Sequence, residues 1–247
     1  GGCRCGAAQR GRATGAGTIS AEIFDFGVIS LRLGIAAPAT PTWADYVTFG
    51  GALHGDAGCR SLCDAALHDL HAALGSSIQR RQIAPVTEDY IVYRAAALCD
   101  AEGTAITPPR LSGDALAALL LNEGRELSPA AKRELLPHRF AYTTRDYAVL
   151  TWESALVVEP DAEDQDVEYV LEFANAQLLE LRVFDAMLDA ELPRMYDRVA
   201  AVRGRPTALF RRYRSLLAEL QTLVADTTEI VERVENAIKV TDDVYLA

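Results

Sequence analysis

The feature that most limits the fold is a regular spacing of apolar and small residues between Asp164 and Val202. These residues recur at alternating steps of four and three, and one acidic residue, Asp185, interrupts the series. This spacing predicts a helix that packs along one stripe against another helix. At 1.5 Å per residue the helix would be roughly 60 Å long, which exceeds an ordinary globular helix. The stripe consists of Val167, Leu171, Ala174, Leu178, Leu181, Leu188, Leu192, Met195, Val199 and Val202.

A second stripe with the same spacing follows a turn at Gly204–Thr207, and it predicts a long antiparallel helical hairpin over 161–247. Pairing residues whose numbers sum to about 411 aligns the two stripes as a coiled coil. In this register Asp185 faces Thr227, the one polar residue of the second stripe. We therefore predict a polar layer in which Asp185 accepts a hydrogen bond from Thr227 and also contacts Arg182. The apolar members of the second stripe are Tyr213, Leu216, Leu220, Leu223, Ile230, Val234 and Ala237.

Residues 19–160 alternate strand-like and helix-like segments, which predicts an α+β domain. We expect a mixed or antiparallel sheet with helices on one side. One strand is expected over Ala21–Ile35 and another over Glu88–Cys99, because both are rich in β-branched and aromatic residues. The segments His138–Tyr142 and Tyr147–Glu159 are expected to pair antiparallel. One face of the latter would carry Leu150, Trp152, Ser154, Leu156 and Val158.

Hydroxyl side chains mark the expected helix starts in the same domain, because they accept hydrogen bonds from the free N–H groups of a first turn. Proline at the first helical position supports one of these starts. The expected helices are one capped by Thr42 or Thr40 that runs to about Leu53, one over Ala57–Ile78, one from Ser112 to Asn122, and one opened by Ser128-Pro129 that ends before Pro137.

The composition is that of a folded acidic protein. Half of the 247 residues are hydrophobic, and the formal net charge of −11 argues against a general nucleic-acid-binding surface. The five cysteines are odd in number and unevenly placed, which indicates reduced thiols and a cytoplasmic location. No apolar run reaches the roughly 18 residues of a membrane span. Both ends look truncated, and the Gly-, Ala- and Arg-rich segment 1–18 is expected to be disordered.

Acidic residues crowd the entry to the long helix. Paired carboxylates can hold Mg²⁺ or act as acid and base, so a metal-assisted hydrolase using carboxylates near Glu153 and Glu180 is one alternative. Acids near the positive end of a helix dipole, and an ion network around Glu180, are the simpler interpretations. We therefore assign no catalytic residue, metal ligand or cofactor. The acids at the entry are Glu153, Glu159, Asp161, Glu163, Asp164 and Asp166, and the network comprises Glu180, Arg182, Asp185 and Asp189.

A second apparent metal set lies on one predicted helix. Cys59 and Cys63 share a face of that helix, whereas His68 and His71 point elsewhere at 100° per residue. Four ligands so arranged cannot converge on one ion, so packed thiols and surface histidines are expected.

The predicted hairpin tip is basic. No acidic residue occurs between Arg198 and Arg214, which contrasts with the net charge of the chain. The helix dipole does not explain the arginines at the start of the second helix, where positive charge is mildly unfavourable. We therefore hypothesise that the tip meets anionic lipid headgroups, RNA or an acidic partner. The partner-binding candidates are Arg203, Arg205, Arg211, Arg212 and Arg214.

Four blocks of the sequence carry a family resemblance, and they are Ile23–Ile29, Asp146–Glu153, the helix block Leu171–Arg182, and the closing Val234–Ala247. They resemble the RMD/RMND family, whose members are named for a role in meiotic nuclear division and contain a domain of unknown function. The resemblance implies a bacterial member and a missing C-terminal segment that is often hydrophobic. Mitochondrial members are linked to membrane association and to support of organellar translation, and the resemblance implies no catalytic residues.

Two functions are consistent with these observations. The preferred one is a non-enzymatic interaction or scaffold protein that binds a protein partner or itself. It would be cytoplasmic and peripheral to, or anchored in, the inner membrane through the missing segment, with no small-molecule substrate. The alternative is the metal-assisted hydrolase, which requires several carboxylates around one point.

Overall fold

The computed structural model describes residues 17–37, 42–54, 56–75, 86–100, 103–104, 106, 111–136 and 138–202, together with single positions between 214 and 232. The chain divides into two compact units. The first contains most of the chain up to Glu172, and the second contains the segment around Glu88 and the chain from Phe173 onward. Mixed α and β content is confirmed, with two sheets and five helices among the described residues.

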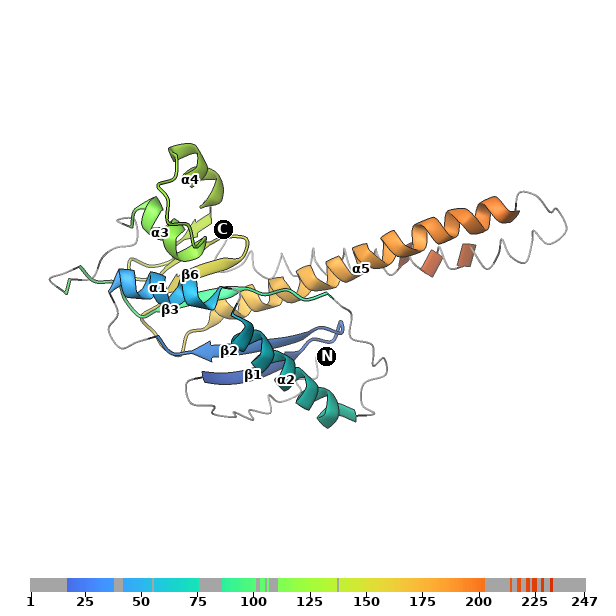
Figure 1. Cartoon of the computed structure of the whole chain (residues 1–247), viewed down its shortest axis with the longest axis horizontal. Helices are drawn as coiled ribbons and strands as arrows, with labels where there is room; N and C mark the ends of the chain where they lie inside the picture. The colour runs from blue at the N-terminus through green and yellow to red at the C-terminus, as the bar shows by residue number, and fades with distance from the viewer. Residues whose placement is uncertain are drawn as a thin grey trace. The chain divides into compact units, whose positions relative to one another are not determined.

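The larger sheet of the first unit has four strands in the order β3-β6-β5-β4, of which β3 and β6 are labelled in Figure 1. Strand β3 (Ile91–Ala95) pairs parallel with β6 (Ser154–Val158), in the register Ile91 to Ser154. Strand β5 (Tyr147–Leu150) pairs antiparallel with both β6 and β4 (His138–Phe140). The sheet is therefore mixed, which is one of the two predicted alternatives.

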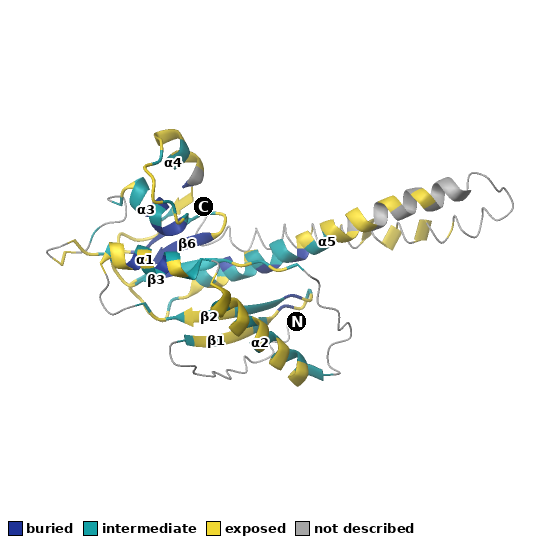
Figure 2. Cartoon of the chain, viewed as in Figure 1, coloured by how far each residue is buried: buried dark blue, intermediate teal, exposed yellow. Residues whose placement is uncertain are grey.

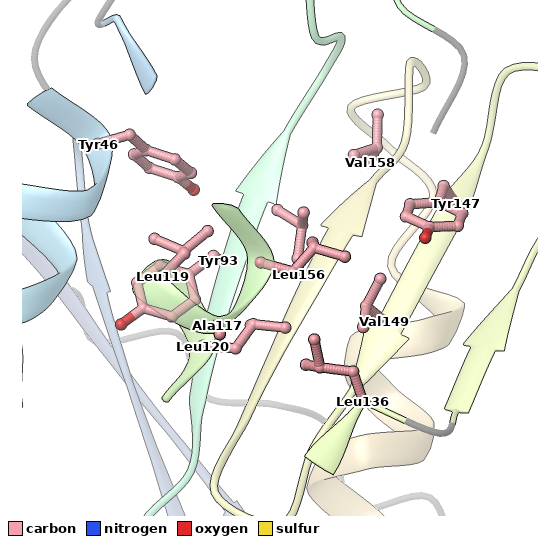
Figure 3. Packing of buried hydrophobic residues seen from close by; sticks show 11 residues of the cluster. Tyr46, Tyr93, Ala117, Leu119, Leu120, Leu136, Tyr147, Val149, Leu156 and Val158 are labelled. Carbon is pink, nitrogen blue, oxygen red and sulfur yellow. The ribbon is translucent and has the colours of Figure 1, made fainter. Parts of the chain in front are cut away.

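The central strand β6 is buried along its whole length. Leu156 and Val158 pack into the main core, which Figure 3 shows between the sheet and the helices α1 (Trp43–Leu53) and α3 (Gly113–Leu120). Ala155 and Val157 face the other way and pack with Leu171 of α5 (Asp166–Val202). Each buried Leu or Val side chain stabilises the fold by about 1.5–3 kcal/mol relative to exposure. The expectation of helices on one side only is therefore wrong, because α5 covers the second face.

The predicted helix starts are confirmed in the first unit. Thr42 caps α1 in a reciprocal arrangement with Asp45, in which each side chain accepts from the other residue's backbone N–H. Ser112 caps α3, and Ser128 caps α4 (Pro129–Leu135), each by accepting from the N–H three residues on. The helix α2 (Ala57–Leu74) is capped by Asp56 and ends at Gly75, whose φ of 48° suits glycine.

The expected single strand Ala21–Ile35 is instead an antiparallel hairpin of β1 (Gly17–Ile23) and β2 (Ile29–Ile35). The chain reverses at Gly27, which has a φ of 93°, and Phe24 N–H donates to the Val28 carbonyl at 2.9 Å. Apolar β-forming residues lie on both sides of this reversal with only Asp25 and Gly27 between them, so periodicity does not reveal the turn. Strand β1 begins inside the segment 1–18 that was predicted to be disordered, and residues 1–16 lie outside the described part.

The expected long strand Tyr147–Glu159 is also two strands, β5 and β6, joined by a turn at 151–153. Thr151 closes this turn, because its N–H donates to the Ser154 carbonyl at 2.8 Å. Trp152 therefore projects into solvent and does not share a face with Leu150 and Leu156. The antiparallel partner of the His138–Tyr142 segment is confirmed as the first of these two strands.

The predicted long helix is confirmed as α5, whose 37 residues continue through Pro193 (Figure 1). The second arm of the hairpin is not shown as a continuous element. Single described positions between 214 and 232 are helical, and the Thr222 and Thr228 hydroxyls each donate to the carbonyl four residues back. The turn at Gly204–Thr207 and most of the second stripe lie outside the described residues, so the antiparallel pairing stays a prediction.

Candidate functional site

Arg94 of β3 holds the chain where it enters α5. Its guanidinium donates to Oε1 of Glu168 at 2.6 Å and to the backbone carbonyls of Asp161 and Asp164, both at 2.7 Å. The Glu168 side chain is only 13% exposed, so this ion pair is screened less than a surface pair. The contact fixes the connection from β6 and the first turn of α5 to the edge strand of the sheet.

Arg32 of β2 holds the same helix from the smaller sheet. Its guanidinium donates to Oε1 of Gln165 at 3.0 Å and pairs with the carboxylate of Glu172. On the neighbouring strand, burial raises the pKa of Glu22, and the negative charge of Glu172 adds to this effect while Arg32 opposes it. The first two turns of α5 are thus fastened by arginines from two separate sheets.

A buried aromatic cluster lies between α1 and β3. The Tyr93 hydroxyl lies 2.9 Å from Nε2 of His54, and the Tyr46 hydroxyl donates to the Arg94 carbonyl at 3.0 Å. The two tyrosine rings meet edge to face, with centroids 5.9 Å apart. Burial raises the pKa of both Tyr46 and Tyr93 to about 12, so both phenols stay protonated near neutral pH. Figure 3 shows these rings pointing into the core.

Sequence reasoning missed this cluster, because its members are up to 48 residues apart and no local pattern joins them. A protonated phenol beside an imidazole can exchange a proton with a bound molecule in an enzyme. Here, among the described residues, no carboxylate or thiol forms a hydrogen bond with the Tyr93–His54 pair. The arrangement therefore fastens α1 to the sheet.

Three of the acidic residues predicted at the start of α5 accept hydrogen bonds from nearby backbone N–H groups. Carboxylate oxygens of Glu159, Asp161 and Asp164 each accept from the N–H two residues on, at 2.8, 3.0 and 3.1 Å. Glu153 lies apart from them, exposed in the β5–β6 turn. This arrangement agrees with the interpretation of acids at a helix N-terminus rather than with a convergent site.

The structure offers no support for the hydrolase alternative. Among the described residues, no group of three or more His, Cys, Asp or Glu side chains could hold a metal ion. Glu153 and the buried Glu180 belong to different units. Cys59 and Cys63 are free thiols on α2, and burial raises the pKa of both, which makes them less reactive.

The predicted polar layer is only partly within the described residues. Arg182 forms an ion pair with Glu88, and Asp185 is exposed. Thr227 lies outside the described part, so its contact with Asp185 stays a prediction. The basic candidates Arg203, Arg205, Arg211 and Arg212 also lie outside it, and Arg214 is helical and exposed.

No helix in the described part is both long enough and apolar enough to cross a lipid bilayer. This finding includes α5, which carries charged residues along its length.

Comparison with known proteins places the chain in a family of unknown function. A family model described as the N-terminal domain of the uncharacterized protein MJ0711 matches residues 4–165, and the chain belongs to this family. The match ends where α5 begins. No solved structure matches the chain.

One curated relative is the uncharacterized protein MJ0711 of Methanocaldococcus jannaschii. It is 32% identical over 73 residues, which are 30% of this chain and 23% of that protein. The chain therefore matches less than a quarter of the length of this relative.

Proposed function

We propose that this chain is a non-enzymatic interaction or scaffold protein of the RMD/RMND type. The observation that carries the proposal is that two arginines, Arg94 and Arg32, form hydrogen bonds with the start of α5 from two different sheets. Ion pairs from two sheets to one helix start make a rigid base for a helix that continues to Val202. Such a base suits an element that presents a surface to another protein.

The surface that we assign to this role is on the later part of α5. Leu181 and Met187 are exposed there, and Figure 2 shows that exposed positions predominate on this stretch. Exposed apolar residues on a helix favour packing against another helix. In the sequence register the second arm packs along the stripe that includes Leu181, and a second copy or a protein partner would pack beside it, at the exposed Met187.

The cellular setting is part of the same proposal. A cytoplasmic protein of a bacterial type, held at the inner membrane by a further C-terminal segment, would agree with the RMD/RMND resemblance. The arginines at 203–214 would then face anionic lipid or RNA, for which the acid-free run from Arg198 to Arg214 is the support.

The test uses the purified chain and its Leu181→Asp/Met187→Asp variant. We expect the chain to self-associate in sedimentation experiments, or to retain a defined partner in a pull-down from its own organism. The variant should lose that association, because two buried charges without partners oppose an apolar contact.

The matched control is Asp189→Asn, which changes an exposed polar residue of the same helix and should leave association unchanged. A chain that stays monomeric, and that retains the same proteins as the double variant, would contradict the proposed function.

A further inference from the structure

The β5–β6 turn presents a tryptophan to solvent. Trp152 is 73% exposed, although the other tryptophan, Trp43, packs against the core. A tryptophan offers a large apolar surface and a polar N–H, and it is among the residues that contribute most to protein interfaces. An exposed tryptophan at a turn is therefore a candidate contact for a partner protein.

The turn below Trp152 is held by several hydrogen bonds. The Thr151 hydroxyl donates to the Ser154 carbonyl at 2.9 Å and accepts from the Ser154 N–H at 3.1 Å. Just before β3, the Tyr90 hydroxyl donates toward the Thr151 carbonyl at 3.0 Å and the Ser154 carbonyl at 2.8 Å. The pKa of Tyr90 is raised to about 12 by its burial, so the phenol keeps the proton that it donates.

The residue after Trp152 is also fixed, because the Glu153 carbonyl accepts from the Ile91 N–H at 3.1 Å. A turn held on both sides loses little conformational freedom when a partner binds. The indole is thus presented on a preorganised base.

Two exposed carboxylates lie at the same end of the sheet as Trp152. Glu153 is exposed next to it in the turn, and Asp89 is exposed just before β3. Ile91 pairs with Ser154 in the parallel β3–β6 pair. Asp89 precedes Ile91 by two residues and Trp152 precedes Ser154 by two residues, so both lie at the same end of the sheet. Neither carboxylate forms a hydrogen bond or ion pair with a residue that the structure describes.

We propose that Trp152, Glu153 and Asp89 form a docking surface for a lysine- or arginine-containing segment of a partner protein. A cation over the indole face gains a cation–π interaction, and the two carboxylates attract the same charge. These carboxylates would repel an anionic membrane surface. The surface deepens the proposed interaction function, on which it rests, but it uses residues outside α5.

The test exploits the fact that the sequence has two tryptophans. In the Trp43→Phe variant, Trp152 is the only source of tryptophan fluorescence. This change is tolerable because the buried indole N–H of Trp43 forms no hydrogen bond with any described residue. Titration with a peptide of alternating arginine and glycine should shift the emission to shorter wavelength, and added salt should weaken the effect.

Exchanging Glu153→Gln and Asp89→Asn in this background should weaken peptide binding roughly tenfold, because both attractive charges are lost. The matched control is Tyr142→Ala, which removes an aromatic side chain 72% exposed in a different turn and should leave binding unchanged. If Trp43→Phe unfolds the chain, the difference in emission between the wild type and Trp152→Phe supplies the same signal.

An unchanged Trp152 emission with the peptide would overturn the proposal. An emission shift with phosphatidylglycerol vesicles and none with the peptide would also overturn it and would indicate a membrane-facing turn. The Leu181→Asp/Met187→Asp variant should keep the peptide response, so a failure of the α5 surface and a failure of the Trp152 surface are distinguishable.

Discussion

Gly50 shows how closely α1 approaches the sheet. A Cβ atom at this position would lie 2.7 Å from Cε1 and 3.0 Å from the hydroxyl of Tyr93. The Tyr93 ring is almost fully buried and contacts His54, so it has little room to move. The absent side chain is therefore what allows helix and strand to pack at this distance.

We predict that Gly50→Ala destabilises the protein. Overpacking costs about 1–3 kcal/mol, which outweighs a gain in helix propensity of up to about 1 kcal/mol. The midpoint of urea unfolding should fall. Gly51→Ala is the control, because its Cβ would meet the side chain of the exposed Asn122, which can move away. Equal midpoints for the two variants would contradict the packing argument.

The start of α5 is an element whose position depends on a few charged contacts. Arg94 joins three segments, since β3 carries it, the 161–164 loop supplies two carbonyls, and α5 supplies Glu168. By contrast, the Arg125–Glu123 pair joins two neighbours in one loop, and the Arg125 side chain is 87% exposed. The two ion pairs have similar lengths but different consequences, because only the first connects distant parts of the chain.

Arg94→Met should therefore loosen the helix start. We expect the free energy of unfolding to fall by about 2–3 kcal/mol, since a partly buried carboxylate and two carbonyls lose a charged donor. Hydrogen exchange measured by mass spectrometry should become faster for the amides of residues 161–172. Arg125→Met should leave both quantities almost unchanged. If exchange at 161–172 stays as slow as in the wild type, the contact does not hold the helix.

The whole chain combines a first unit with an internal core and a second unit built on the later part of α5. The second unit depends on the predicted return of the chain along α5. In the register deduced from the two stripes, Leu181 faces Ile230 and Leu188 faces Leu223.

A cysteine pair tests this register. In a background with the five native cysteines changed to serine, Leu181→Cys and Ile230→Cys should form an intramolecular disulfide under mild oxidation. Leu181→Cys with Leu223→Cys should not, because the second site is shifted by about two helical turns, roughly 10 Å. Peptide mapping after proteolysis would identify the bridge. Equal yields from both pairs would rule out a fixed antiparallel register.

Most of the helices could be predicted because their signals are local. The caps at Thr42, Ser112 and Ser128 each involve residues three apart, and the stripe of α5 repeats along one continuous segment. The match to a family of unknown function agrees with the resemblance to a family built on a domain of unknown function.

The strand breaks and the candidate contacts could not be predicted in the same way. The turns at Gly27 and Trp152 lie between segments rich in β-forming residues, and each strand ends there because of its pairing with a neighbouring strand. Two contacts join segments more than 60 residues apart. They are the parallel pairing of β3 with β6 and the ion pair between Arg94 and Glu168 of α5. Hydrogen bonds within one helix turn are specified by adjacent residues, whereas contacts between distant segments form only when packing of the apolar core brings them together.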